Sequence, residues 1–159
     1  MKRQKKATPT LKRAGAAKAA RSRAKAGSKP AAARAKGPQS VAVGLTANDA
    51  AASIKWYCDV LGFSLKERWD EGGFVGGSVV NGGATINIGQ DDWKLGRDRK
   101  KGQGVRIFIT TADDIDKYAR AITSRGGTLD HEPKSEWKFR AFAITDPDGY
   151  KLTFMRPLK

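Results

Sequence analysis

The sequence predicts an α+β domain that is built from a repeated unit and preceded by a basic tail. One pattern occurs twice, at residues 40–63 and 104–128. It consists of a predicted strand, an Asn-Asp or Asp-Asp pair, an amphipathic helix and a glycine. The two copies keep one constant offset, because Asp114 stands where Asp49 does and Gly127 where Gly62 does. Three further strand-like stretches follow each copy. The predicted element order is therefore β-α-β-β-β, repeated once.

The first unit begins with a strand and a helix. Residues 41–47 are a short, mainly apolar run that ends at Asn48-Asp49, a pair typical of a helix N-cap. Apolar side chains then recur at helical spacing through residues 50–61, and Gly62 suits the left-handed residue that ends a helix. Strands separated by glycine-containing turns are predicted next, at residues 63–69, 74–80 and 84–89.

The second unit repeats this order. Residues 105–111 are a predicted strand, Asp113-Asp114 precede the helix, and Gly126-Gly127 end it. An Asp-Pro-Asp-Gly turn joins the last two strands of this unit. Its three remaining strands are predicted at residues 128–131, 138–145 and 150–156.

The charge of the chain divides it into a tail at residues 1–39 and a domain at residues 40–159. Most of the formal net charge of +15 belongs to the tail, which contains no Asp or Glu. Because it has few large apolar side chains, it cannot bury enough surface to offset its ordering entropy, and we expect disorder. Within the domain, the two modules span residues 40–90 and 104–157, and the polar residues 91–103 link them.

Composition also restricts compartment and partners. A single cysteine, Cys58, excludes an internal disulfide and suits the cytoplasm, and no apolar run is long enough to span a membrane. A flexible basic arm can bind nucleic acid non-specifically through phosphate neutralisation, although a merely solubilising extension explains it equally well. The basic side chains at the start of this arm are Lys2, Arg3, Lys5, Lys6, Lys12 and Arg13.

Two motifs carry a resemblance to a known superfamily. They are ASIKWYCDVLGF at residues 52–63 and DPDGYKLTF at residues 146–154. With the repeat, they make residues 41–157 resemble the vicinal oxygen chelate superfamily, which includes glyoxalase I, the bleomycin-resistance proteins and the extradiol dioxygenases. The resemblance implies two βαβββ modules that curve their eight strands into an open barrel around a cleft. It also implies a homodimer, since many members complete their clefts by pairing or swapping modules. The alternative is a monomeric barrel, because both modules lie in one chain here.

The resemblance locates four positions at which metal-dependent members hold a cation. Here those positions are Ala42, Asn87, Ile107 and Thr153. Two of these side chains have no donor atom, and an amide or hydroxyl oxygen is a weak ligand, whereas a transition metal needs about three good ligands. We therefore expect neither a catalytic metal nor another cofactor, and we assign no catalytic residue.

Several other side chains are candidates for ligand contact. Asn87 and Thr153 would face the implied cleft and could hydrogen-bond a neutral or zwitterionic ligand. Trp93 lies in the polar linker, where no core needs it, and Arg97 in the same segment could attract an anion, although a solvated charge run is commoner. His131 follows an aspartate and precedes a glutamate, so it is either a general base or, as we favour, a solvent-facing histidine in a turn. We assign the remaining strand and linker aromatics to the core or a subunit interface: Trp69, Phe74, Trp137, Phe139 and Phe142.

The sequence thus predicts a metal-free small-molecule-binding protein of the glyoxalase and bleomycin-resistance type, and it does not specify the ligand. The alternative is a glyoxalase-type lyase, isomerase or dioxygenase with a non-standard site. A further alternative is a nucleic-acid-associated protein that acts through its basic tail. Whether the protein is an enzyme stays open, with binding favoured over catalysis.

Overall fold

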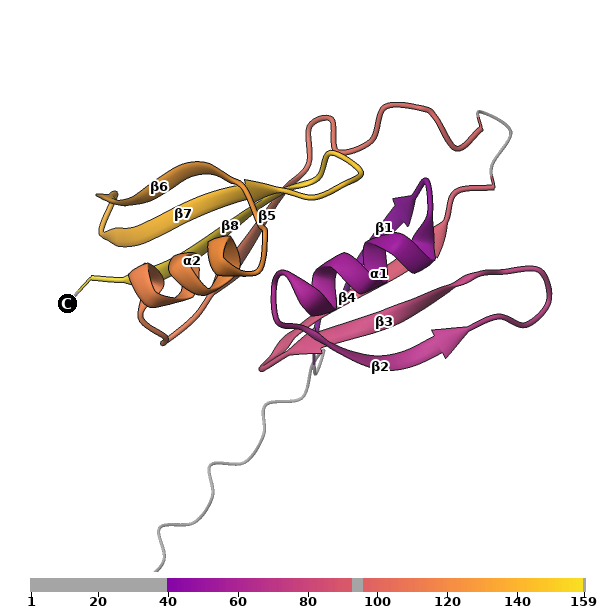
Figure 1. Ribbon diagram of the computed structural model, residues 1–159, viewed down its shortest axis with the longest axis horizontal. Coiled ribbons are helices and arrows are strands. Elements are labelled where there is room, and N and C mark those ends of the chain that lie inside the picture. The colour runs from indigo at the N-terminus through magenta and orange to yellow at the C-terminus, as the bar shows by residue number, and fades with distance from the viewer. Residues whose placement is uncertain (1–39, 93–95, 159) are drawn as a thin grey trace, which may run out of the picture. The chain divides into compact units, whose positions relative to one another are not determined.

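The computed structural model describes residues 40–92 and 96–158 and contains both expected modules (Figure 1). The basic tail and Trp93 lie outside the described residues, so the predictions made for them stay predictions. No helix in the described part of the chain is long and apolar enough to cross a membrane.

The first module is a mixed four-stranded sheet covered on one face by a helix (Figure 1). The strand order is β1-β4-β3-β2, with β1 parallel to β4 and the other neighbours antiparallel. Its elements are β1 (Val43–Ala47), α1 (Ala50–Asp59), β2 (Ser64–Trp69), β3 (Gly76–Asn81) and β4 (Ala84–Gln90).

The second module repeats this topology, with the order β5-β8-β7-β6 and β5 parallel to β8. The eight predicted strands are therefore present, hydrogen-bonded as two sheets of four. Its elements are β5 (Arg106–Thr110), α2 (Ile115–Ser124), β6 (Leu129–Glu136), β7 (Phe139–Thr145) and β8 (Lys151–Pro157).

Strand β6 is longer than the sequence suggested. The prediction ended this strand at His131, whereas β6 continues past Pro133, which cannot donate a hydrogen bond to a neighbouring strand. The proline is tolerated here since β6 is at the edge of its sheet, and the pairing register shifts between His131 and Lys134. As a result, the strand continues from His131 to Glu136 and adds the side chains of these residues to the sheet.

Both helices begin and end as the repeat predicts. The side chain of Asp49 accepts a hydrogen bond from the Ala52 amide at 3.0 Å, and that of Asp114 accepts one from the Lys117 amide at 3.0 Å. After α2, Gly126 adopts the left-handed backbone at φ +89°, where other residues are strained.

One hydrophobic cluster joins the helices to the inner faces of both sheets. In the second module, the rings of Phe142 and Phe154 stack at 5.2 Å, and the ring of Tyr118 meets Phe154 edge-on at 5.1 Å. Phe142 and Phe154 are fully buried, and each contributes about 2 kcal/mol through the apolar surface it removes from water. Phe142 is therefore a core residue, as predicted.

The two sequence motifs meet where the modules contact each other. The Tyr57 hydroxyl of the first motif donates to Asp146 Oδ2 of the second at 2.8 Å. Asp148 accepts from the Asn48 amide at 2.7 Å and from the Ser53 hydroxyl at 2.5 Å. The residues that carry the family resemblance therefore hold helix α1 against the turn between β7 and β8.

A different set of bonds holds α2 to the first module. The Tyr118 hydroxyl donates to the Leu61 carbonyl at 2.8 Å and accepts from the Asn81 amide nitrogen at 3.0 Å. Arg125 Nε donates to the Val60 carbonyl at 2.9 Å. The two halves of the repeat are thus similar in fold but not in the chemistry of their contacts.

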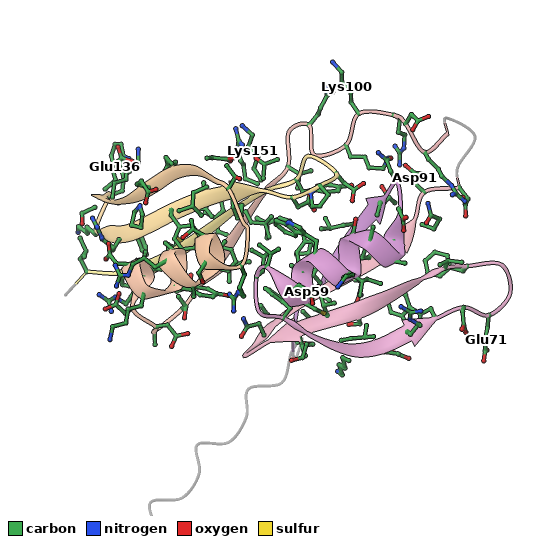
Figure 2. All side chains as sticks on the ribbon, in the orientation of Figure 1. Asp59, Glu71, Asp91, Lys100, Glu136 and Lys151 are labelled. Atoms are coloured by element: carbon green, nitrogen blue, oxygen red, sulfur yellow. The ribbon has the colours of Figure 1, made fainter. Side chains whose placement is uncertain are left out.

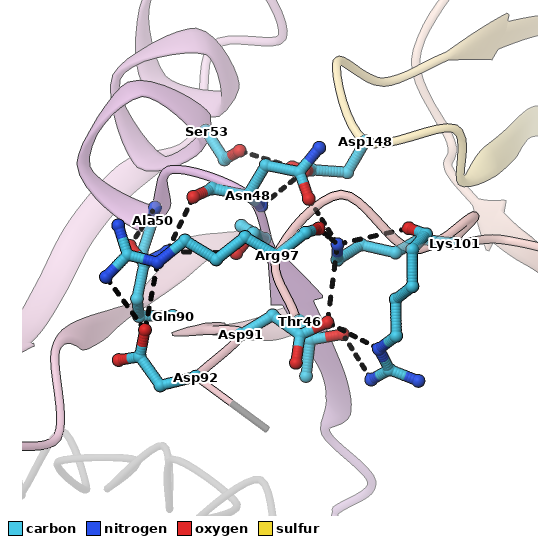
Figure 3. A network of polar contacts seen from close by, with 12 residues as sticks. Thr46, Asn48, Ala50, Ser53, Gln90, Asp91, Asp92, Arg97, Lys101 and Asp148 are labelled. Atoms are coloured by element: carbon cyan, nitrogen blue, oxygen red, sulfur yellow. Dashed lines mark hydrogen bonds and ion pairs between the residues drawn. The ribbon is translucent and has the colours of Figure 1, made fainter. Parts of the chain in front are cut away.

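A buried ion pair lies within the linker, and one of its partners, Lys101, also bonds to the first module (Figure 3). Asp91 and the Lys101 side chain are almost fully buried, and Lys101 Nζ lies 3.3 Å from Asp91 Oδ2. Arg99 Nε donates to the same oxygen at 2.6 Å. Lys101 also donates to the Arg97 carbonyl and to Asn48 Oδ1, and the bond to Asn48 holds this part of the linker to the first module.

Candidate ligand-binding site

The face of the second sheet that is turned away from α2, here called the open face, carries the candidate site. Along β8, Leu152 and Phe154 point into the core, so Thr153 and Met155 between them point to the open face. On β5, Phe108 is the partner of Thr153 and is 62 % exposed. Phe108 and Met155 are therefore apolar side chains that lie on this face, outside the core.

A cavity of about 500 Å³ lies on the open face. Its volume falls within the range of small-molecule sites, which is roughly 300–1,000 Å³. Aromatic and aliphatic side chains make up most of its wall, and a few polar groups stand at the edge. The lining residues are Phe108, His131, Lys134, Glu136, Trp137, Phe139, Ala141, Thr153 and Met155.

Trp137 is the most unusual residue of this cavity. It occupies the turn between β6 and β7 and is 88 % exposed. Trp137 and Lys138 both have left-handed backbones, at φ 49° and 67°, which cost non-glycine residues about 1–2 kcal/mol each. A large apolar side chain is thus held in solvent on a strained backbone, which stability alone does not explain.

The polar groups at the edge of the cavity are engaged with their neighbours. Lys134 Nζ lies 2.9 Å from Glu136 Oε2 in an exposed ion pair. His131 lies within β6, and its Nδ1 is 3.0 Å from the Glu132 carbonyl oxygen. The expected position of His131 in a turn is therefore wrong, since the strand continues past it and turns its ring toward the cavity. The hydrogen bond from His131 is to a main-chain group rather than to a carboxylate.

The predicted ligand-contact residues are distributed over two sheets. Asn87 is on β4 of the first sheet, opposite Gly44, and Thr153 is on β8 of the second sheet, opposite Phe108. Of the two, Thr153 lines the cavity. Arg97 Nε donates to Asp92 Oδ1 at 2.9 Å, so Arg97 forms an exposed ion pair within the linker.

The register of β5 differs by one residue from the predicted alignment. Ile107 is the partner of Leu152 and is buried in the core, so it points away from the open face. Arg106 takes the place that corresponds to Ala42, because Ile107 corresponds to Val43 in the pairing of the two parallel strand pairs. The segment between this strand and the helix N-cap is one residue longer in the second module, which explains the shift.

The side chains at the positions that the family resemblance implies, together with Arg106 from the observed register, form a poor donor set for a transition metal. Ala42 is exposed just before β1 and has no donor atom, Arg106 is a cation, and Asn87 and Thr153 offer weak neutral oxygens. Within residues 40–92 and 96–158, no group of three or more His, Cys, Asp or Glu side chains is arranged to hold a metal ion.

The first sheet also has aromatic side chains on its face away from the helix. The rings of Trp69 and Phe74 lie 6.0 Å apart, and Phe74 covers Gly89, where any side chain would collide with its ring at 2.7 Å. Phe74 is 53 % exposed. Phe142 is in the core, whereas Phe74 and Trp137 are exposed, so for these two the expectation of a core or interface position leaves the interface, which stays a prediction.

The chain belongs to the Glyoxalase/Bleomycin resistance protein/Dioxygenase superfamily, which it matches over residues 39–154. Among curated proteins it is similar to a probable lactoylglutathione lyase of Synechocystis, with 31% identity over 65% of this chain and 84% of the relative. It is also similar to the uncharacterized protein YaeR of Escherichia coli, with 29% identity over 69% of this chain and 89% of the relative.

Solved structures show the same fold at low identity. A glyoxalase/bleomycin resistance protein/dioxygenase from Nocardioides superimposes with a TM-score of 0.61 and 18% identity, over 79% of this chain and 87% of that one. TioX from Micromonospora superimposes with a TM-score of 0.60 and 19% identity, over 76% of this chain and 100% of that one. These similarities concern the fold and carry no information about the ligand.

Proposed function

We propose that the protein binds a small organic molecule in the cavity on the open face and that it does so without a metal ion. The observation that carries the proposal is Trp137, exposed on a strained turn beside Phe108 and Phe139. Exposed aromatic side chains around a cavity are typical of ligand contact, because they contribute much area at little cost in side-chain entropy. The weak donors at the family's metal positions favour binding without metal chemistry.

We also propose that the protein forms a homodimer in which a second copy closes the cavity. Phe108, Phe74 and Trp137 leave large apolar areas in solvent on the two sheets. Apolar side chains grouped in this way mark interfaces or ligand sites more often than ordinary surface. Sedimentation velocity at micromolar concentration measures the oligomeric state, and a monomer at every concentration would contradict this part of the proposal.

The binding proposal is tested with N-phenylnaphthylamine, an uncharged aromatic probe whose fluorescence rises in apolar surroundings. We expect the full chain to bind it, and Trp137→Gly to weaken binding about tenfold, since removing a central aromatic contact costs roughly 1–2 kcal/mol. Glycine relieves the left-handed strain at φ 49°, so stability should change by no more than about 1 kcal/mol. Loss of binding would then not reflect loss of the fold.

A matched control removes another exposed apolar side chain. Leu65 is 44 % exposed on β2 and does not line the cavity. Leu65→Ala should bind the probe as the unmodified chain does. No saturable binding by the unmodified chain, or equal affinity in Trp137→Gly, would refute the proposed site.

A lyase is the second candidate function, and the similarity to the probable lactoylglutathione lyase of Synechocystis favours it. This candidate requires a bound metal or an acid–base pair that we do not assign. Protein purified without chelators should be analysed for nickel, zinc, iron and manganese and assayed for lactoylglutathione formation. A stoichiometric metal together with turnover would replace the binding proposal by this one.

A further inference from the structure

We propose that the ligand is an organic anion whose apolar body lies in the cavity and whose negative group lies against Arg106 and Lys151. This inference rests on the proposed binding function and adds the charge of the ligand to it. It follows from a second hollow, whose residues on β5 and β8 precede those of the cavity on the same face. That hollow has a volume of about 310 Å³ and is lined in part by Arg106, Lys151 and Gln103.

The strand register places the two hollows next to each other. Arg106 precedes Phe108 by two residues on β5, and Lys151 precedes Thr153 by two residues on β8. Residues two apart on a strand share a face and are separated by about 7 Å. A ligand that covers Phe108 and Thr153 therefore reaches the two cations without leaving the face. Figure 2 shows Lys151 and Glu136 toward opposite ends of this sheet, both on the side away from α2.

Arg106 and Lys151 form an unfavourable pair in the absence of an anion. They are direct partners across the parallel strands β5 and β8. Like charges at facing positions repel each other and destabilise a sheet. In the part of the chain that the structure describes, no carboxylate lies within ion-pair distance of either side chain. Both are exposed, so the charges are accessible to a ligand.

The other charged groups near this end of the sheet are already engaged. Lys101 contributes to the wall of the hollow, but its side chain is buried in the ion pair with Asp91. Asp146 and Asp148, in the turn that leads into β8, accept hydrogen bonds from the Tyr57 and Ser53 hydroxyls. Asp130 accepts a hydrogen bond from the Thr145 hydroxyl at 2.8 Å. Thr145 is the strand partner of Lys151 on β7, so Asp130 is one strand further away.

The two ends of the open face thus differ in charge and polarity. Glu136 is neutralised by Lys134 at the aromatic end, whereas Arg106 and Lys151 leave two positive charges at the other. A cationic ligand would be repelled there, and an uncharged one would leave the repulsion between the two side chains unrelieved. An anion with an aromatic or otherwise apolar body satisfies both ends.

The experiment compares two probes that differ only in a negative group. Anilinonaphthalene sulfonate carries a sulfonate on the aromatic frame of N-phenylnaphthylamine, and both are followed by fluorescence titration of the full chain. We expect the double variant Arg106→Gln/Lys151→Gln to bind the sulfonate about fivefold more weakly, which corresponds to about 1 kcal/mol for two partly exposed ion pairs. Its affinity for the uncharged probe should stay within a factor of about two.

A charge-matched control separates the local pair from the net charge of the protein. Lys66→Gln/Arg120→Gln removes two exposed cations from β2 and α2, away from the open face, and should bind both probes as the unmodified chain does. Because every variant keeps the basic tail, any sulfonate bound there cancels in the comparison. Near-ultraviolet circular dichroism confirms that each variant is folded.

Each outcome decides the inference. Selective weakening of sulfonate binding in the Arg106→Gln/Lys151→Gln variant, with the control unchanged, supports it. If this variant binds both probes as the unmodified chain does, or loses affinity for both equally, the inference is wrong while the proposed function stands. If the unmodified chain binds neither probe, the proposed function fails and the inference fails with it.

Discussion

Removing the Tyr57 hydroxyl should measure how strongly the two modules hold each other. Tyr57 is fully buried and Asp146 is 5 % exposed, so the bond between them is shielded from water. Asp146 Oδ1 accepts from the amides of Asp148 at 3.0 Å and Tyr150 at 2.8 Å, and Oδ2 accepts from Tyr57. In Tyr57→Phe, Oδ2 loses this donor but stays buried.

The expected loss is about 2 kcal/mol, because a hydrogen bond to a charged group contributes about 1.5–3 kcal/mol. Burial and the neighbouring carboxylate raise the pKa of Tyr57, so its hydroxyl remains a donor throughout the accessible pH range. Tyr118→Phe is the matched control. Its hydroxyl bonds a neutral carbonyl, that of Leu61, in a less buried place, and its loss should cost about 1 kcal/mol.

Urea unfolding followed by tryptophan fluorescence gives both free energies, provided that the slope with denaturant is the same in each variant. A double-mutant cycle with Asp146→Asn isolates the pair from other effects of each change. The reasoning is refuted if Tyr57→Phe loses less than about 0.5 kcal/mol or no more than Tyr118→Phe does.

The other predictions concern charge. Burial raises the pKa of the Asp146 carboxyl above the ordinary 3.8, so the folded state binds this proton more tightly than the unfolded state does. The free energy of unfolding therefore falls as the pH rises from about 3.8 to the raised pKa. Asp146→Asn should remove this decline, and urea unfolding at several pH values between about 4 and 7 checks it; an unchanged slope would contradict it. Lys101→Met should cost about 3 kcal/mol, because the buried Asp91 carboxylate loses one of its cations, whereas Lys100→Met at the exposed neighbouring position should cost less than about 0.5 kcal/mol. Deleting residues 1–39 should abolish the binding of duplex DNA at low salt in a mobility-shift assay, since the tail carries most of the net charge; retained binding would locate it in the domain.

Much of the fold was predictable because its signals are local. Asp49 and Asp114 cap the two helices as their position before each apolar stretch suggests, and the repeat gives the element order. The end of β6 was not predictable from Pro133, because only the sheet order shows that this strand is at an edge. The tolerance of an edge strand for proline depends on neighbours that are distant in sequence.

The candidate site was predicted less well, because it depends on register and on which face a side chain occupies. Counting back from Asp114 led to Ile107, while the structure places Arg106 at that position. Trp93 was chosen for its polar surroundings, whereas the exposed tryptophan in the described structure is Trp137. No turn signal marks Trp137 in the sequence, because Trp-Lys lacks the Asn or Gly typical of a two-residue hairpin turn. Its exposure also required knowing that the sheet face beside it is uncovered.

The unequal bonds between the modules determine which halves can pair. Tyr57 of α1 meets a carboxylate at the turn between β7 and β8, whereas Tyr118 of α2 meets an amide, Asn81, at the corresponding turn between β3 and β4. Two first modules brought together would offer each Tyr57 the turn that contains Asn81 and no Asp146. A pair of like halves would therefore lack the bond between Tyr57 and Asp146, and this difference favours the pairing of unlike halves.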